Sequence, residues 1–317
     1  MKVRIDDRLS RDPGAERAEL VAGLRAMPAA IPPKYFYDRL GSALYGAICE
    51  LPEYYPTRTE HTIFGANRVA IANAIGTGTQ FVDLGTGDGV KAEGWLPFLV
   101  PSRYLAVDIA RSVVEQTLSR LSVRYPDLEM KGVVADFTQG LDLAGDLADT
   151  PVTFFYPGSS IGNFTPEDAI PFMHSVQRLC EARPGSGLLI GVDMKKDAAR
   201  LSAAYDDALG VTASFNRNVL NHVNRVLESD FDPTAFAHRG FYAEERGRIE
   251  MHLEAIGRQV VRFDGATRVF EAGERIHTEN SYKYTPDEFE ILLACAGFTT
   301  VRRWQDENRD FAVFYAA

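Results

Sequence analysis

The stretch VDLGTGDGVKAEGW, residues 82–95, decides the fold, because it joins a short apolar run to a helical segment through three glycines at alternate positions. Glycines after a first strand let the backbone turn sharply and approach a ligand. Short apolar runs bounded by Gly, Pro or Asp recur along the chain, at residues 80–85, 103–108, 131–136, 152–159 and 187–193. The intervals between them have helical periodicity, and this alternation is typical of a parallel sheet buried on both faces. We therefore predict a Rossmann-like α/β fold.

The α/β alternation is interrupted between residues 194 and 283, where one amphipathic helix and several short alternating pieces indicate an α+β region. A helix and two strands then follow in residues 284–317. Residues 1–59 begin with a polar stretch in which Leu20, Leu24 and Met27 have helical spacing, and they continue into a segment rich in tyrosine. We predict one domain from residues 60–193 and 284–317, and a second, discontinuous domain from residues 1–59 and 194–283.

The composition is that of a globular protein, with 45% hydrophobic and 25% charged residues among 317. Acidic residues outnumber basic ones by 44 to 34, which argues against binding to nucleic acid or to an anionic membrane surface. The chain starts without a signal-peptide pattern and has no run of about 18 apolar residues. We expect a cytoplasmic monomer that acts on a small molecule.

The three cysteines, Cys49, Cys180 and Cys295, lie far apart and form neither a disulfide framework nor a metal motif. Such cysteines are typical of a reducing compartment. The six histidines show no H-x-x-x-H spacing, so we predict no metal site.

Acidic residues follow three successive apolar runs and indicate an adenosyl cofactor. Asp88 lies inside the glycine turn, where it would repel a pyrophosphate, although capping of the next helix is its commoner role. Asp108 lies where a Rossmann-type site places an acid for the ribose hydroxyls. Asp136 and Phe137 together suit an adenine, and any one of these acids alone is more often a turn former. Because the carboxyl ends of parallel strands share one edge, we expect these acids to lie close together. Since Asp88 would repel a pyrophosphate, we favour S-adenosylmethionine over NAD.

Asn163 follows the fourth apolar run, within SIGNF. Its amide offers a donor and an acceptor, which suits a zwitterionic substrate. The alternative is a left-handed turn residue after Gly162, and the local pattern does not choose between the two.

Six segments together resemble one known family, and the resemblance extends from about Pro32 to the C-terminus. They are YDRLGSALYGAICELPEYYPTRTE (37–60), PGSSIGN (157–163), RLSAAYDD (200–207), FNRNVLNHVNRVLESDFD (215–232), RIEMHL (248–253) and ENSYKY (279–284). The family is that of the histidine-specific α-N-methyltransferases of ergothioneine biosynthesis, which convert L-histidine into its trimethylated betaine, hercynine. The resemblance implies a Rossmann-like class I methyltransferase domain, S-adenosylmethionine as cofactor, and a discontinuous α+β substrate domain.

The resemblance also implies roles for single residues. The implied cofactor contacts are Gly85, Lys91, Asp108, Asp136 and Phe137. The implied partners of the substrate's carboxylate and amino end are Asn163 and Tyr205, with Tyr37 beside the reacting amine. The implied surroundings of the imidazole are Tyr54, Met251, Glu279 and Ser281. The chain departs from the family pattern at Asp88-Gly89, where relatives usually have Ser or Thr, and at Tyr35-Phe36, where Trp-Leu is commoner.

These residue types suit methyl transfer to an amine. Tyr37 can orient the amine or relay its proton, but an unperturbed phenol is no strong base at neutral pH. Glu279 can accept a hydrogen bond from one imidazole nitrogen and Ser281 can serve the other, since residues i and i+2 of a strand share a face. The ordinary alternatives are a solvated charge for Glu279 and a core position for Met251.

We therefore predict an S-adenosylmethionine-dependent L-histidine Nα-methyltransferase that acts repeatedly on one α-amine. One rival is a related enzyme that methylates another aromatic amino acid, such as tryptophan. A second is a non-catalytic module that binds the adenosyl group, and an NAD oxidoreductase is a distant third.

Overall fold

The computed structural model describes residues 4–9 and 13–317. The chain forms two compact units, each assembled from segments that are distant in the sequence. The first consists of Met1–Leu9, Pro56–Lys195 and Tyr284–Ala317, and the second of Ser10–Tyr55 and Lys196–Lys283.

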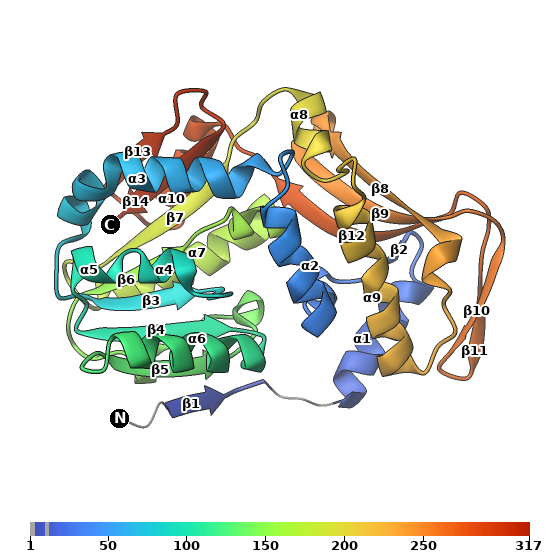
Figure 1. The fold of residues 1–317 in the computed structure, drawn as a ribbon, viewed down its shortest axis with the longest axis horizontal. Helices are drawn as coiled ribbons and strands as arrows, with labels where there is room; N and C mark the ends of the chain where they lie inside the picture. Colours follow the sequence, from blue (N-terminus) through green and yellow to red (C-terminus); the bar gives the residue numbers. More distant parts are fainter. Residues whose placement is uncertain (1–3, 10–12) are drawn as a thin grey trace. The chain divides into compact units, whose positions relative to one another are not determined.

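The first unit contains an eight-stranded sheet with the strand order β1-β5-β4-β3-β6-β7-β14-β13 (Figure 1). Neighbours from β1 to β7 in this order are parallel, whereas β14 and β13 run antiparallel to their neighbours. The strands are β1 Arg4–Asp7, β3 Gln80–Leu84, β4 Arg103–Asp108, β5 Glu129–Val134, β6 Val152–Tyr156, β7 Gly187–Asp193, β13 Val301–Gln305 and β14 Phe311–Ala316. The predicted Rossmann-like α/β fold is confirmed.

Helices cover this sheet and account for its apolar runs. They are α3 Tyr55–Ile75, α4 Val90–Glu93, α5 Leu96–Leu99, α6 Arg111–Arg124, α7 Pro166–Glu181 and α10 Pro286–Cys295, with the 3₁₀ helices η2 Phe137–Gln139, η3 Ala144–Asp146 and η4 Ser160–Asn163. Apolar residues of α3, α5 and α6 share one cluster with sheet residues such as Phe81 and Phe155. The helices α7 and α10 pack together, and α7 also packs against β7. Every residue of β7 is buried, as expected for a strand inside a parallel sheet.

Two of these helices begin at clear capping residues. The Thr165 side chain accepts a hydrogen bond from the Asp168 N–H at the start of α7, and a proline occupies the first turn. Thr285 and Glu288 form a capping box at the start of α10. The local sequence therefore fixes where both helices begin.

The amino-terminal strand corrects one predicted boundary. We expected residues 1–59 in the second domain, but β1 pairs in parallel with β5 and belongs to the first unit. The segment RIDD has no alternating apolar pattern, and its position depends on backbone pairing and on Arg8, which contacts the buried Asp146 at 2.7 Å. Residues 1–3 and 10–12, also within the first thirty, lie outside the described residues.

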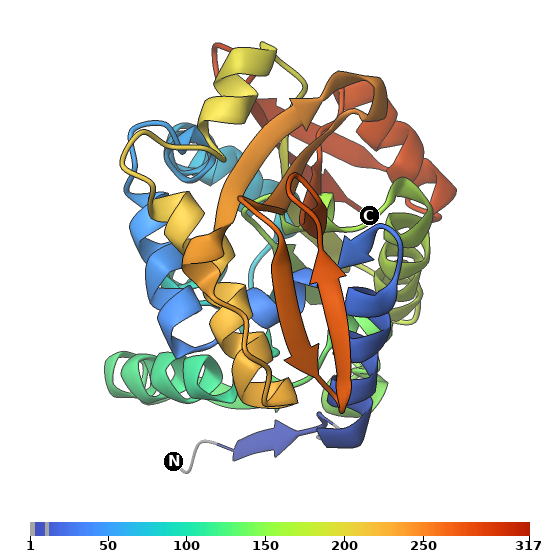
Figure 2. The same ribbon diagram turned by 90° about the vertical axis from the view of Figure 1, so that its right-hand side faces the viewer.

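The second unit is an α+β arrangement around a four-stranded sheet of order β2-β12-β9-β8 (Figure 2). Its strands are β2 Ala29–Ala30, β8 Phe236–Ala243, β9 Arg248–Ala255 and β12 Arg275–Tyr282, and β10 Gln259–Phe263 pairs with β11 Ala266–Phe270 as a separate hairpin. Its helices are α1 Pro13–Arg25, α2 Arg39–Cys49, α8 Ala198–Ala203 and α9 Val211–Leu227, with the 3₁₀ helices η1 Pro33–Phe36, η5 Pro233–Ala235 and η6 Glu244–Arg246.

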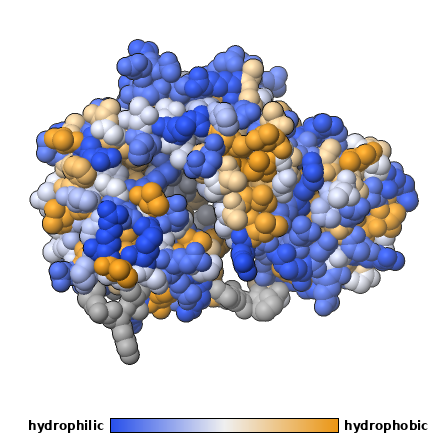
Figure 3. Space-filling model, in the orientation of Figure 1, coloured by the Kyte–Doolittle hydropathy of each residue, from blue (hydrophilic) through white to orange (hydrophobic). Residues whose placement is uncertain are grey.

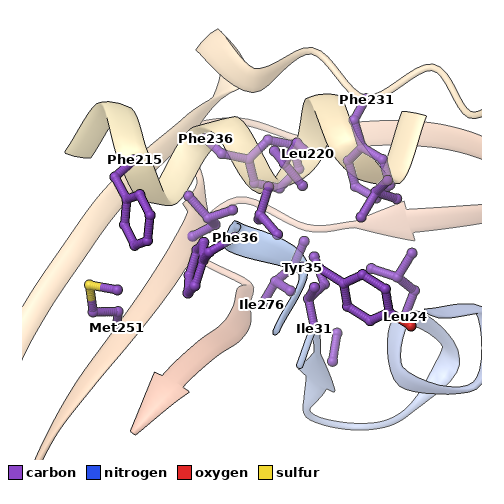
Figure 4. Packing of buried hydrophobic residues seen from close by; sticks show 14 of the residues in the cluster. Leu24, Ile31, Tyr35, Phe36, Phe215, Leu220, Phe231, Phe236, Met251 and Ile276 are labelled. Carbon is purple, nitrogen blue, oxygen red and sulfur yellow. The ribbon is translucent and has the colours of Figure 1, made fainter. Parts of the chain in front are cut away.

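The apolar face of α9 forms the centre of this unit's core. Phe215 and Leu220 of α9 lie in one cluster with Phe36, Met251 and Ile276 (Figure 4). The rings of Phe36 and Phe215 stack with their centroids 4.6 Å apart. The amphipathic helix predicted from this segment is therefore present, and it holds η1 against the sheet.

Among the described residues, no helix combines the length and apolar character needed to cross a bilayer. Hydrophilic residues predominate on the face shown in Figure 3, with apolar residues in smaller groups.

Candidate active site

The glycine loop leaves β3 in a backbone conformation that favours glycine. Gly85, Gly87 and Gly89 have φ angles of 69°, 53° and 68°. A Cβ on Gly89 would lie 2.3 Å from the Thr117 methyl carbon, and the Thr117 hydroxyl donates to the Gly87 carbonyl at 3.0 Å. Thr117 of α6 therefore holds the loop and leaves no room for a side chain at Gly89.

Replacing Gly89 with alanine should destabilise the protein by about 2–4 kcal/mol, because strain at positive φ adds to the contact with Thr117. Urea unfolding measures this change. The double variant Gly89→Ala/Thr117→Ser removes the clashing methyl group and should recover part of the loss. If Thr117→Ser gives no recovery in the Gly89→Ala background, the contact is not the cause.

The first acid of the predicted cofactor site has a structural task. The Asp88 side chain accepts a hydrogen bond from the Val90 N–H at 3.0 Å, at the beginning of α4. The N-cap of α4 is Gly89, which has no capping side chain, so the commoner alternative of a capping role is replaced by a side-chain turn at the preceding residue.

Asp108 connects the glycine loop to the end of β4. Its carboxylate accepts hydrogen bonds from the Gly87 N–H at 3.1 Å and the Ala110 N–H at 2.9 Å. Burial raises the pKa of Asp108, while these N–H groups lower it. A carboxylate has about four acceptor positions, so two N–H bonds leave capacity for the hydroxyls of a ligand.

Asp136 and Phe137 lie just beyond the end of β5. Asp136 accepts a hydrogen bond from the Thr138 N–H at 3.1 Å, which starts η2. The Phe137 ring packs between Tyr156 and Phe172, with both centroid distances at 5.8 Å, and its edge lies 3.9 Å from where a Gly85 Cβ would be. The ring therefore forms an apolar wall beside the glycine loop, and the structure brings these predicted cofactor residues to one edge of the sheet.

Lys91 and Asn163 lie at the neighbouring strand ends. Lys91, in α4, places its ammonium 2.6 Å from the carboxylate of the buried Glu60. Asn163 is exposed at the end of η4, in the loop after β6. The alternative of a left-handed turn at Asn163 is wrong, because the residues of positive φ in this loop are Gly158, with φ 78°, and Ser159, with φ 60°. The side chain of Asn163 is thus on the same strand-end edge as the glycine loop.

The second unit contains a buried polar cluster that includes two predicted substrate residues. The Tyr205 and Ser281 hydroxyls are 3.0 Å apart, and the Lys283 ammonium donates to both, at 2.9 and 2.8 Å. Lys283 is 1% exposed. Sequence analysis did not single out Lys283, although it lies in the quoted ENSYKY segment, because its burial depends on contacts distant in sequence.

A relay of side chains holds the backbone of Tyr205. The Asn216 amide contacts His238 Nδ1 at 2.8 Å, and His238 Nε2 contacts the Tyr205 carbonyl at 2.8 Å. Burial lowers the pKa of His238, so the neutral ring donates through Nε2 and accepts at Nδ1. Asn216 belongs to the FNRN segment, and this is a structural role for that motif.

Tyrosine rings connect Tyr37 to Tyr205. Consecutive centroid distances are 5.9 Å from Tyr37 to Tyr45, 6.5 Å from Tyr45 to Tyr54, and 6.1 Å from Tyr54 to Tyr205. Burial raises the pKa values of both Tyr45 and Tyr54 above their ordinary range. The two phenols are therefore protonated at neutral pH. Tyr45 completes this row, although the sequence gave no reason to prefer it over the other tyrosines of its segment.

A β-bulge sets the direction of Glu279 and Ser281. His277 pairs with His252 across β9 and β12, and Glu279 pairs with Met251, so Thr278 is an extra residue between them. Paired residues of antiparallel strands share a face, so the bulge turns Glu279 toward the face of the buried Met251. The Thr278 hydroxyl lies 2.8 Å from the Asn216 side-chain oxygen and 3.0 Å from the Met251 carbonyl. Met251 is thus both a core residue and the neighbour of Glu279.

Glu279 is partly accessible but lies in an environment that disfavours its charge. Desolvation raises its pKa to about 7, against an opposing effect of the Lys283 charge. The carboxyl group therefore titrates near neutral pH.

The raised pKa of Glu279 predicts a pH-dependent stability. The folded state holds the proton more tightly than the unfolded state, so this group's contribution is lost as pH rises through about 7. Glu279→Gln should therefore raise the free energy of unfolding more at about pH 8 than at about pH 5, by about 1–2 kcal/mol after allowance for solvent screening. Urea unfolding at both pH values tests this, with the exposed Glu245→Gln as control. Equal effects at both pH values would contradict it.

Three potential metal ligands lie together on the opposite face of the β9–β12 pair. Glu250, His252 and His277 each offer a ligand atom within 4.8 Å of the others. Burial raises the pKa of Glu250, but hydrogen bonds from Arg248 and His252 bring it down to about 2. Because this carboxylate already has a cationic partner, we interpret the cluster as an ion-pair network. The absence of a metal site remains a prediction.

The fold and the strand-end acids define a Rossmann-like class I methyltransferase. A sequence model described as histidine-specific methyltransferase, SAM-dependent, matches residues 16–317, and the chain belongs to this family. The resemblance inferred from the motifs is thereby confirmed.

Relatives of known name support the same assignment. The histidine N-alpha-methyltransferase of Mycobacterium tuberculosis is 40% identical over all of both chains. That of Mycolicibacterium smegmatis is 38% identical, over 100% of this chain and 99% of the relative. A 4-dimethylallyltryptophan N-methyltransferase of Penicillium roqueforti is 27% identical, over 93% of this chain and 92% of the relative.

Proposed function

We propose that the protein transfers methyl groups from S-adenosylmethionine to the α-amino group of L-histidine, three times in succession, to give hercynine. The observation that carries the proposal is the placement of Glu279 and Ser281 on one face of the bulged strand β12. An acid and a hydroxyl at this spacing can serve the two ring nitrogens of an imidazole. The two full-length mycobacterial relatives are named for methylation of histidine.

The strand-end edge of the first unit suits the proposed cofactor. Asp108 would accept hydrogen bonds from the ribose hydroxyls, and the Phe137 ring would cover the adenine, with Asp136 beside its amine. The glycine loop leaves space for a close approach of the ligand at Gly85, and Lys91 would meet the carboxylate of the cofactor. When bound, the cofactor supplies a methyl group that its sulfonium already activates.

The α-amine must be neutral to accept a methyl group. Tyr37 would orient the amine and pass its proton to water, with Tyr54 as a protonated neighbour in the same row of rings. Asn163 and Tyr205 would hold the carboxylate and amino end of the substrate. The task of the protein is mainly alignment and the exclusion of water.

The hydrogen bonds among Tyr205, Ser281 and Lys283 determine whether the Ser281 hydroxyl is available to donate to an imidazole. Ser281 accepts a hydrogen bond from Lys283, and its own proton is left to donate either to Tyr205 or to a ligand. If Tyr205 donates to Ser281, the Ser281 hydroxyl donates to the unprotonated ring nitrogen while Glu279 accepts from the protonated one. A neutral imidazole has an N–H that donates to Glu279 and a second nitrogen that accepts from Ser281, whereas an indole has only an N–H donor.

Mass spectrometry tests the proposal. The protein is incubated with S-adenosylmethionine and each natural amino acid separately, and we expect a mass gain of one to three methyl groups on histidine alone. Methylation of tryptophan instead would favour the related enzyme of different specificity. Binding of the cofactor without methylation of any amino acid would favour the non-catalytic module.

We also propose that the enzyme is a cytoplasmic monomer. The negative net charge and the free Cys49, Cys180 and Cys295 support this. Light scattering after size-exclusion chromatography should give a mass near the 35.1 kDa of one chain. Twice that mass would contradict the monomer.

A further inference from the structure

Glu60 is a buried acid that none of the roles above uses. It lies on α3, in the first unit, and is 0% exposed. One of its oxygens is 2.6 Å from the Lys91 ammonium, and the other accepts a hydrogen bond from the Gly158 N–H at 2.8 Å. Both acceptor atoms are therefore occupied, as a buried carboxylate requires.

The surrounding chain is shaped to admit this carboxylate. A Cβ on Gly191, in the middle of β7, would lie 2.0 Å from the Glu60 oxygen that meets Gly158. A Cβ on Gly158 would lie 3.2 Å from the Lys91 ammonium. Glycine at both positions lets Glu60 reach across β7 and lets Lys91 lie against the loop after β6.

The strand order indicates which end of the cofactor lies near this group. Phe137 follows β5, Asp108 follows β4, and the glycine loop follows β3, and these strands are adjacent in the order β5-β4-β3-β6. A ligand whose adenine lies at β5 and whose ribose lies at β4 extends next toward the loops after β3 and β6. Lys91 and Gly158 are in those two regions, so the Glu60 group lies at the amino-acid end of an adenosyl sulfonium ligand.

We propose that Glu60 is a positioning residue for the amino-acid end of the cofactor. It fixes the Lys91 ammonium and the Gly158 backbone, and Lys91 then binds the cofactor carboxylate with donors that Glu60 does not take, since an ammonium has three. Glu60 is too deeply buried to meet the ligand itself. The inference rests on the proposed cofactor site and adds a residue that this site requires.

A comparison of the affinities for two ligands distinguishes this role from a general effect on the fold. S-Adenosylhomocysteine carries the amino-acid end, and 5′-methylthioadenosine has the same adenosyl group without it. Titration calorimetry of the full chain should show that Glu60→Ala lowers the affinity for S-adenosylhomocysteine by about 30–100-fold. The affinity for 5′-methylthioadenosine should fall by less than about 3-fold. Glu60→Gln keeps the shape and the acceptor for Gly158, and should give a smaller loss with the same selectivity.

Coupling to Lys91 provides the second readout. Lys91→Ala should show the same selective loss, and Glu60→Ala/Lys91→Ala should be little weaker than Lys91→Ala alone, because both changes remove one interaction. The matched control is Glu93→Ala, a buried acid of α4 that pairs with Arg120 and Arg124 instead of Lys91. This control should not discriminate between the two ligands.

Three results would overturn the proposal: equal weakening of both ligands by Glu60→Gln, no weakening of either, or additive losses in the double variant. Failure of the proposed cofactor site gives a different result, because the unaltered protein would then bind neither ligand. Failure of methyl transfer to histidine is read separately, from the mass spectrometry of the unaltered protein.

Discussion

Replacing Glu279 with alanine should lower kcat/KM for histidine by about 100-fold or more, and should leave the affinity for S-adenosylhomocysteine within about 3-fold. The variant removes the acceptor for the imidazole N–H and leaves a substrate N–H without a partner in a desolvated site. The predicted cofactor residues belong to the other unit. Steady-state kinetics and calorimetry measure the two quantities.

The conservative Glu279→Gln variant sharpens this test. Its amide oxygen can accept the same hydrogen bond without the charge, so its loss for histidine should be smaller than that of Glu279→Ala. If both variants lose cofactor affinity as much as histidine use, Glu279 has been placed in the wrong role.

Asp108→Ala should lower the affinity for S-adenosylhomocysteine by about 100-fold, whereas Asp88→Ala should change this affinity by less than about 5-fold. Asp108 holds the glycine loop through the Gly87 N–H and has acceptor capacity left for a ribose. Asp88 accepts one backbone N–H bond at the beginning of a short helix, so its loss should appear as about 1 kcal/mol of stability. Calorimetry and urea unfolding on the two variants measure both effects.

The pair of acids serves as its own control, because both lie at the glycine loop. Asp108→Asn keeps one acceptor for the loop and should be intermediate in affinity. A large loss of affinity in Asp88→Ala, with little loss in Asp108→Ala, would reverse the assignment and move the ligand to the other side of the loop.

The parallel sheet could be predicted from the sequence because each buried strand is a short apolar run with clear ends. The strand β1 could not, since RIDD has no apolar alternation and depends on its pairing with β5. Likewise, the local bond of Asp88 follows from the ordinary turn chemistry of aspartate, whereas the residues of positive φ after β6 are Gly158 and Ser159 instead of Asn163.

The candidate site, too, could be predicted from the sequence only in part. The i, i+2 spacing of Glu279 and Ser281 gives one shared face, but no local pattern says which face is the buried one. That choice depends on the register with β9. Lys283 and Glu60 lay in quoted segments, yet their burial and their partners come from residues far away in sequence.

The extra residue Thr278 means that the face taken by Glu279 depends on strand alignment as well as on side-chain identity. If Thr278 paired with Met251 in an uninterrupted ladder, Glu279 would lie opposite Glu250, on the other face of β12, although it is still encoded. Deletion of Thr278 would keep Glu279 opposite Met251, so a one-residue gap at this place is compatible with the same site, whereas a one-residue slip between the strands is not.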